Sequence, residues 1–289
     1  MRILITGAFG QLGHALQSVL SKKSNYELIC TGRKVKKGQE GIPLDIRNQV
    51  ALKELINTTA PDILINLAAM TNVDACELNP KLAGEINVAG LEHICDSFKG
   101  KIIHLSTDYV FDGTSGPYKE DDPLNPISIY GKTKLASEHI LLEKDIKNLV
   151  IRGNVLYDYS PHTSASFLNW VVSSLKGNQE IKVVEDQFNN PTWTRSMSDI
   201  IVLSIENDLE GIIHWGDSEH ISRFEFAKLI AKKFSLNESL IKPVLTSELN
   251  QPARRPLQSG LSTEKLVNML DIIPPSIDDC LDEIIKTIQ

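Results

Sequence analysis

Short apolar runs alternate with longer amphipathic segments along the first half of the chain. The apolar runs cover residues 2–6, 26–31, 62–66, 101–106 and 149–152. Nearly continuous apolar sequence of this length is typical of strands that are buried on both faces of a parallel sheet. The segments 11–20, 50–56 and 80–98 instead repeat their apolar residues at helical spacing. This alternation predicts an α/β fold with a Rossmann-type doubly wound parallel sheet.

The regular alternation ends near residue 155. Helical segments at 167–175, 196–205, 223–234 and 275–288 then flank short strand-like runs at 181–184 and 212–215. We therefore predict a first domain over residues 1–155 and a smaller C-terminal α/β lobe over residues 156–289. The segment near 194–216 is expected to return to the first domain.

Composition narrows the class of protein. A chain of 289 residues with 42% hydrophobic and 23% charged residues fits one large or two interlocked domains. No apolar run approaches the ~20 residues of a membrane span, and the net charge of −7 argues against nonspecific nucleic-acid binding. The first strand begins at residue 2, which leaves no room for a signal peptide. Four widely spaced cysteines fit reduced thiols and a cytoplasmic protein, with no metal site: Cys30, Cys76, Cys95 and Cys280.

A glycine-rich turn separates the first predicted strand from the first helix. Its spacing is G-x-x-G-x-x-G, from Gly7 through Gly10 to Gly13. Glycines let a pyrophosphate approach the backbone, and a helix N-terminus presents free N–H groups to it. A glycine triplet also marks ordinary turns, but the position between strand and helix favours a dinucleotide site. Its predicted cofactor-binding residues are Gly7, Phe9, Gly10, Gln11, Leu12 and Gly13.

The end of the second predicted strand bears on the choice of cofactor. An acidic residue there would suit the ribose 2′-hydroxyl of NAD, but this chain has Thr31-Gly32-Arg33-Lys34. A guanidinium offers a planar fork of donors to a 2′-phosphate. Arg33 therefore predicts NADPH, with NADH still possible. The alternative is that this basic loop is only a solvated surface.

The stretch from Lys101 to Lys134 carries the candidate chemistry. A buried strand ends in Ser106-Thr107, and a later helix begins near Tyr130, with Lys134 one turn on. A phenol near pKa ~10 is a poor acid at neutral pH, but a nearby cation stabilises the phenolate and lowers that value. The Thr107 hydroxyl can orient a carbonyl oxygen or relay the proton. Alternatively, Tyr130 and Lys134 form only a surface pair on the helix.

The combination of glycine loop, Ser106-Thr107 and Tyr130-x-x-x-Lys134 resembles the extended short-chain dehydrogenase/reductase family. The stretch from Ser106 to Phe111 is most similar to its dTDP-4-dehydrorhamnose reductase branch. The resemblance makes the first domain NAD(P)-binding and the second lobe substrate-binding. It implies catalytic roles for Tyr130, Lys134 and Thr107. Further cofactor contacts are implied for Asp45, Ile46, Ala68, Ala69, Tyr130 and Lys134, although Asp45 could instead cap the helix that follows.

The resemblance also implies a substrate. In this branch the frames at 186–192 and 253–259 line a sugar-nucleotide site, and an arginine of the second frame could meet a diphosphate or tie the last loop to the core. The implied substrate contacts are Thr71, Val73, Thr107, Asp108, Tyr109, Gln187, Asn190 and Arg255.

The expected reaction is NADPH-dependent reduction of the 4-keto group of a nucleotide-linked 6-deoxyhexose, with dTDP-4-dehydro-L-rhamnose first among the candidates. Dehydratases of the superfamily carry Asp-Glu after the threonine, whereas this chain has Asp108-Tyr109. Alternatives are a nucleotide-sugar epimerase and a non-catalytic regulatory subunit of the methionine adenosyltransferase type. Val155 stands where many rhamnose-forming members have a tryptophan beside the sugar. Ala15 stands where some members have a glutamate that contributes to a magnesium-bridged dimer, so no metal is expected. The protein is predicted to be a monomer or a homodimer.

Overall fold

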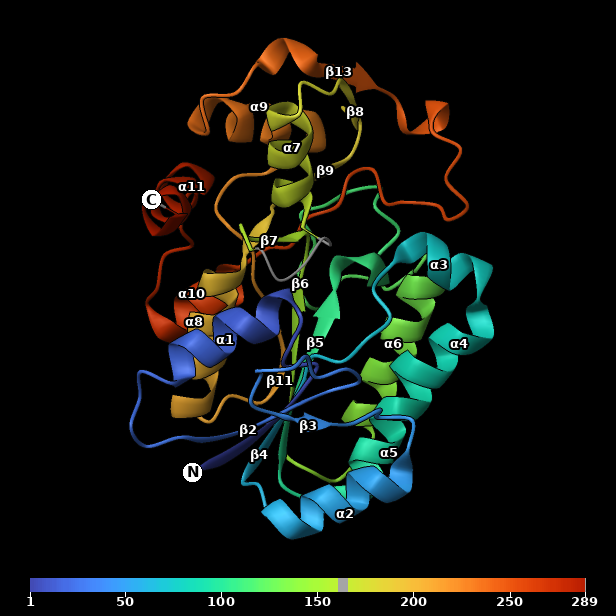
Figure 1. Cartoon of the computed structure of the whole chain (residues 1–289). Helices are drawn as coiled ribbons and strands as arrows, with labels where there is room; N and C mark the ends of the chain where they lie inside the picture. The colour runs from blue at the N-terminus through green and yellow to red at the C-terminus, as the bar shows by residue number, and fades with distance from the viewer. Residues whose placement is uncertain (161–165, 289) are drawn as a thin grey trace.

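The computed structural model describes residues 1–160 and 166–288. Its central sheet is parallel throughout and has the order β11-β6-β5-β4-β1-β2-β3 (Figure 1). The strands are β1 (Arg2–Thr6), β2 (Glu27–Gly32), β3 (Ile42–Pro43), β4 (Ile63–Asn66), β5 (Lys101–Thr107), β6 (Asn148–Gly153) and β11 (Gly211–His214). The strand order reverses direction between β1 and β4, which defines a switch point at the carboxyl edge. The predicted Rossmann-type fold is confirmed.

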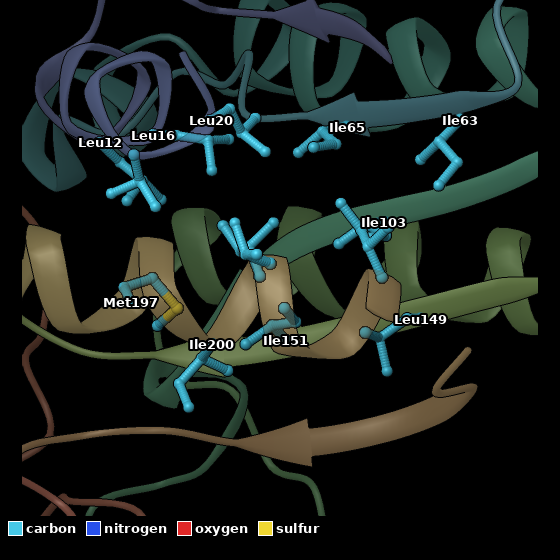
Figure 2. Close-up of a cluster of buried hydrophobic side chains, with 14 of the residues drawn as sticks. Leu12, Leu16, Leu20, Ile63, Ile65, Ile103, Leu149, Ile151, Met197 and Ile200 are labelled. Atoms are coloured by element: carbon cyan, nitrogen blue, oxygen red, sulfur yellow. The ribbon is translucent and has the colours of Figure 1, made fainter. Parts of the chain in front are cut away.

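Helices cover both faces of this sheet (Figure 1). One layer contains α1 (Gln11–Leu20), α8 (Thr194–Glu206) and α10 (Glu264–Leu270), and the other contains α2 (Gln49–Thr59), α5 (Gly90–Ser97) and α6 (Ile129–Leu142). Figure 2 shows Leu12 and Leu16 of α1 in one buried cluster with Met197 and Ile200 of α8 and with side chains of the sheet. These side chains are 4% exposed or less, so their burial stabilises the sheet by the hydrophobic effect.

The predicted helix over 80–98 has an internal irregularity. It follows α3 (Val73–Leu78) and consists of α4 (Pro80–Gly84), a π-helical turn at Glu85–Ala89, and α5. A π turn changes the direction of the side chains it contains. Asn87 in this turn points inward, where its amide accepts from the Met70 N–H at 2.7 Å and donates to the Thr133 hydroxyl at 3.0 Å. The turn thereby ties the loop after β4 to α6.

A second core lies beyond the carboxyl edge of the sheet, at the top of Figure 1. Its apolar residues come mainly from α7 (Phe167–Lys176), β8 (Ile181–Val184), α9 (Arg223–Lys233), β13 (Ile241–Val244) and α11 (Ile277–Ile288). Two short pairings join this lobe to the rest, β7 (Leu156–Tyr157) with β10 (Thr192–Trp193) and β9 (Phe188–Asn189) with β12 (Ile221–Ser222). Short 3-10 turns occupy Asp108–Val110, Glu238–Leu240 and Thr246–Glu248.

Part of the second half of the chain packs against the main sheet and its helices. Helix α8 packs on α1, and β11 pairs with β6 at the edge of the main sheet. The division at residues 155 and 156, with a return near 194–216, remains our proposal for the domain boundaries. Within the described ranges, no helix has both the length and the apolarity needed to cross a bilayer.

Candidate active site

A cavity of about 720 Å³ opens at the carboxyl edge of the sheet, where β1, β2, β4, β5 and β6 end. Ligands of doubly wound folds bind at this edge, near the switch point. Most of the residues predicted from sequence line it: Gly7, Gly10, Gln11, Leu12, Gly13, Arg33, Asp45, Ile46, Ala68, Ala69, Thr71, Val73, Thr107, Asp108, Tyr109 and Tyr130. The parallel sheet therefore brings together loops that are far apart in the sequence.

The glycine loop requires glycine for steric reasons. Gly7 has φ of 69°, and a Cβ there would lie 2.7 Å from the backbone N of Ala68. A Cβ on Gly13 would lie 2.3 Å from the Ala8 carbonyl oxygen. Both clashes are with backbone, so the loop after β1 can approach β4 and α1 only without side chains here. Gly10 is the N-cap of α1, so free N–H groups of the first turn are available to an anion at the cavity.

Phe9 is not among the residues that line the cavity, so its predicted cofactor contact stays a prediction. Its ring packs against Gly32 and Gly41, where an added Cβ would lie 2.7 and 2.3 Å from ring atoms. It also makes an edge contact with His14, with ring centroids 6.2 Å apart. Phe9 therefore supports the end of β2 from outside the cavity, because the space beside two glycines accommodates an aromatic ring.

Arg33 and Asp45 both line the cavity on the side of β2 and β3. The Asp45 carboxylate accepts three hydrogen bonds from the Arg47 side chain, the shortest at 2.6 Å from Nη2. The Arg47 side chain is the main cause that lowers the Asp45 pKa, and the charge of Arg33 contributes. Asp45 is not the N-cap of α2, because Asn48 accepts the Ala51 N–H at 3.1 Å. Arg33 has no ion pair among the described residues.

Tyr130 stands in the first turn of α6, after the N-cap Ser128. Removal from water raises the pKa of its phenol, while a contact with the Thr107 hydroxyl acts in the opposite direction. The Tyr109 ring lies edge-on to it, with centroids 5.5 Å apart and an interplanar angle of 71°. The Thr107 hydroxyl also donates to Asp108 Oδ1 at 3.1 Å. The phenol therefore stays protonated at neutral pH and faces a hydroxyl at the end of β5.

Lys134 lies below the cavity and does not line it. Its Nζ contacts His104 Nε2 at 2.9 Å and donates to the Leu105 carbonyl at 2.6 Å. Burial lowers the pKa of Lys134 to about 8, with the charge of Glu138 opposing. The sequence predicted that Lys134 would lower the Tyr130 pKa, but burial dominates and raises it. In this structure the ammonium is held by strand β5 because buried donors need acceptors.

A chain of buried polar groups continues behind Lys134. His104 Nδ1 lies 3.0 Å from the Asn66 amide, and Asn66 accepts from the Thr6 hydroxyl at 2.5 Å. Burial and the Lys134 charge lower the His104 pKa well below its usual value, so the ring is neutral. The sequence analysis did not predict this chain, although His104 lies within the apolar run of β5 and Asn66 ends that of β4. Polar residues at aligned positions of neighbouring strands are the signal that could have found it.

Three predicted substrate contacts lie outside the cavity. Gln187 donates to the Thr246 hydroxyl at 3.0 Å, and Asn190 bonds the Leu261 backbone N–H at 2.8 Å. Arg255 forms a bidentate pair with Asp74, at 2.8 and 2.6 Å. These polar groups satisfy one another and the backbone, so they tie the last loop to the core. Substrate contact by these three residues therefore stays a prediction, and in this structure their polar groups bond within the protein.

Asn190 has an indirect relation to the cavity. Its Oδ1 accepts from Asn154 Nδ2 at 3.0 Å, and both Asn154 and Val155 line the cavity. Val155 has φ of 40°, a left-handed conformation that is strained for a β-branched residue. The hydrogen bonds of Asn154 hold the backbone next to this strained residue.

Arg223 and Phe167 line the cavity from the second lobe and were missed. Arg223 is the first residue of α9, after Ser222, which caps that helix in a capping box with Glu225. Its guanidinium carbon lies 5.1 Å from the centroid of the Phe167 ring. The capping box gave a signal for the helix start, but no local signal indicates that this start faces the cavity.

No group of three His, Cys, Asp or Glu residues in the described part of the chain is arranged to hold a metal ion. The four cysteines are free thiols, and burial raises the pKa of Cys30, Cys76 and Cys95 to about 11. Low reactivity follows, because the thiolate is the reactive form.

The family model described as RmlD substrate binding domain matches residues 1–289. The chain belongs to this family. It is 30% identical over 288 residues to a dTDP-4-dehydrorhamnose reductase of Aggregatibacter actinomycetemcomitans, with 94% of each chain covered. It is 31% identical over 277 residues to methionine adenosyltransferase 2 subunit beta of Xenopus laevis, covering 93% of this chain and 82% of that one. A solved dTDP-4-dehydrorhamnose reductase of Bacillus anthracis, in complex with NADP, superposes with a TM-score of 0.91 at 31% identity, covering 99% of each chain. The resemblance to extended short-chain dehydrogenases/reductases is confirmed.

Proposed function

We propose that this protein is an NADPH-dependent oxidoreductase that reduces a nucleotide-linked keto-sugar. The observation that carries the proposal is one cavity that combines a phosphate-binding glycine loop with a buried phenol. The glycine loop and Arg33 lie at one part of it, and Thr107 and Tyr130 line another. Relatives of the same family are named as dTDP-4-dehydrorhamnose reductases.

The cavity suits a dinucleotide phosphate. Gly7 and Gly13 hold the backbone where a pyrophosphate would meet the N-terminus of α1, and any Cβ there would clash. Arg33 is exposed and has no carboxylate partner among the described residues, so its fork is available to a 2′-phosphate. Ala68 and Ala69 leave room beside the ribose. When bound, NADPH would supply the hydride.

Tyr130 is proposed to donate the proton to the oxygen of the reduced carbonyl. Its raised pKa keeps it protonated at neutral pH, as a proton donor requires, and Thr107 orients the same oxygen through its hydroxyl. The positive charge of Lys134 lies below and would stabilise the phenolate that remains. Lys134 is also proposed to contact the nicotinamide ribose if its ammonium leaves His104.

Asp108 supports reduction without dehydration. Its two carboxylate oxygens accept hydrogen bonds from Thr107 and Ser259, and burial raises its pKa. The carboxyl group is thus occupied, and the next residue is a tyrosine where dehydratases of the superfamily have glutamate. We propose a 4-keto-6-deoxyhexose as the sugar, with dTDP-4-dehydro-L-rhamnose as the first candidate.

The test measures oxidation of NADPH by the purified protein with dTDP-4-dehydro-L-rhamnose. The NADPH absorbance is followed over a period on the order of minutes. The sugar product is identified by NMR. We expect stoichiometric NADPH loss and dTDP-L-rhamnose as the product. Tight NADPH binding without oxidation by any nucleotide keto-sugar would refute the reductase proposal.

A second candidate is a regulatory subunit that binds NADP without turnover. The 31% identity to methionine adenosyltransferase 2 subunit beta of Xenopus laevis supports it. This candidate predicts NADPH binding, no oxidation, and binding to a methionine adenosyltransferase catalytic subunit. Sedimentation of that mixture separates the two candidates and also tests our proposal of a monomer or homodimer. A cytoplasmic location remains part of the proposal.

A further inference from the structure

Arg223 brings a positive charge into the cavity from the second lobe. It lines the same cavity as Asp108, Tyr109 and Tyr130. Its guanidinium lies over the Phe167 ring, a cation–π contact that favours this position of the side chain. Within residues 1–160 and 166–288, no carboxylate forms an ion pair with it and its side chain makes no hydrogen bond. A charged fork of donors therefore faces the substrate space unpaired.

Two other arginines on this side of the molecule differ from Arg223. Arg255 gives its donors to both oxygens of Asp74 and to the Ala253 carbonyl, at 2.8, 2.6 and 2.7 Å. Arg254 is exposed and does not line the cavity. Of these three, Arg223 alone combines an open guanidinium with a position in the cavity wall.

The surrounding charges do not neutralise Arg223. The charge of Asp108 acts on Arg223, but no ion pair joins the two, and the buried Asp108 carboxylate already accepts hydrogen bonds from Thr107 and Ser259. The charge of Arg223 lowers the pKa of both Asp108 and Tyr109, whereas burial raises both. The charge of Arg255 also acts on Arg223, but Asp74 pairs with Arg255 and offsets it. Among the described residues, Arg223 is therefore a positive charge in the cavity wall without a counter-ion.

We propose that Arg223 binds the diphosphate of the nucleotide sugar through charge-assisted hydrogen bonds, in place of the contact predicted for Arg255. This inference rests on the proposed function and names the group that anchors its substrate. A guanidinium matches two phosphate oxygens at once, which a single ammonium does not. Phe167 holds the fork in position, so little side-chain freedom is lost on binding.

The experiment compares Arg223→Gln, Arg223→Lys and the matched control Arg254→Gln. The dissociation constants of dTDP, UDP and NADPH are measured by calorimetry, the two diphosphates against NADP-saturated protein. Hydrogen bonds to charged groups are worth enough to predict a ~10–100-fold loss of dTDP affinity in Arg223→Gln. Arg223→Lys should recover part of that loss. Arg254→Gln should match the wild type, and NADPH affinity should be unchanged in all variants.

The proposal is overturned if Arg223→Gln binds both diphosphates within twofold of the wild type, or if NADPH affinity falls in parallel. It is also overturned if the wild type binds neither diphosphate. Thermal unfolding checks that each variant is folded. If Arg223→Gln is not folded, the affinities of Arg223→Lys are used for the test instead. If dTDP binding depends on Arg223 but no keto-sugar is reduced, the reductase proposal fails while the diphosphate site stands. If reduction proceeds with unchanged KM in Arg223→Gln, the reverse holds.

Discussion

Replacing Glu138 by glutamine should strongly destabilise the floor of the site. The Glu138 and Arg152 side chains are 1% and 0% exposed and join α6 to β6 directly below the end of β5. Glu138 Oε2 accepts from Arg152 Nη2 at 2.7 Å, and Oε1 accepts from Nε at 3.1 Å and from the Ser106 hydroxyl. Glutamine keeps the shape of the side chain but leaves a buried guanidinium without its counter-charge.

Breaking one partner of a buried ion pair typically costs ~3–5 kcal/mol. Arg152 would keep three weaker contacts, to His214 Nε2 at 3.2 Å, to the Glu120 carbonyl at 3.4 Å and to the face of Phe111 at 5.2 Å. These contacts favour the lower end, about 3 kcal/mol. That is a large fraction of the ~5–15 kcal/mol that stabilises a typical domain.

The assay is urea unfolding followed by fluorescence and circular dichroism, with linear extrapolation of the free energy of unfolding. Coincidence of the two signals tests whether the two lobes unfold together. The control is Glu283→Gln, which removes a solvent-exposed partner of Lys286 and should leave the midpoint unchanged. A loss of stability below about 1 kcal/mol, well under the ~3–5 kcal/mol typical of a broken buried ion pair, would refute the reasoning.

A double variant separates lost charge pairing from lost packing. Glu138→Leu combined with Arg152→Met removes both charges and keeps apolar volume between α6 and β6. Replacing a whole buried pair by apolar residues is often neutral or stabilising. The double variant should therefore be more stable than Glu138→Gln alone. If it is less stable, the cost lies in the side-chain shapes and not in the unpaired guanidinium.

Two further predictions concern the site, and a third concerns the buried His214. Tyr130→Phe should reduce turnover ~10²–10⁴-fold because it deletes the proton donor, while NADPH affinity measured by fluorescence stays near normal; a tenth of the activity remaining would exclude Tyr130 as the acid. Arg33→Ala should raise the KM for NADPH far more than that for NADH, and equal effects would make the basic loop a solvated surface. His214 is buried and its pKa is lowered to about 3, so the unfolded chain takes up its proton first as pH falls below ~6.5. The free energy of unfolding therefore falls as pH drops from ~6.5 to 3, and His214 contributes ~1.4 kcal/mol per pH unit to that fall. In His214→Gln this contribution to the slope of stability against pH should disappear. The control is the exposed His139→Gln, whose slope should equal that of the wild type.

The sheet was predictable because strands buried on both faces are apolar along their whole length, which each strand's own sequence shows. The run over 101–106 needs no partner to be identified as apolar, and it forms β5 (Lys101–Thr107). The π turn at Glu85–Ala89 was not predictable, because the periodicity of 80–98 is that of a continuous helix. Asn87 points inward because it forms hydrogen bonds with Met70 and Thr133, which are distant in sequence.

The same distinction applies to the cavity. Loops directly after strands were placed correctly, since the carboxyl ends of parallel strands meet at one edge. Gln187, Asn190 and Arg255 lie in long connections of the second lobe, where a polar side chain that bonds the backbone looks the same in sequence as one that binds a ligand. Arg223 was missed for the converse reason. At the first position of a helix, a charged residue is ordinarily solvated, and only the docking of α9 turns it toward the cavity.

Lys134 shows how burial alters a motif that was recognised correctly. In water, the phenol and the ammonium have nearly equal pKa values of 10.0 and 10.5. Burial moves them apart, because it disfavours the charged form of each: it raises the Tyr130 pKa and lowers that of Lys134 to about 8. The energetic gradient for a proton thus runs from Lys134 toward the phenolate that Tyr130 leaves behind. If Tyr130 donates a proton as proposed, the lysine is therefore better suited to resupply it afterwards than to make it a stronger acid beforehand. His104 and the Leu105 carbonyl hold that proton source in reserve below the cavity.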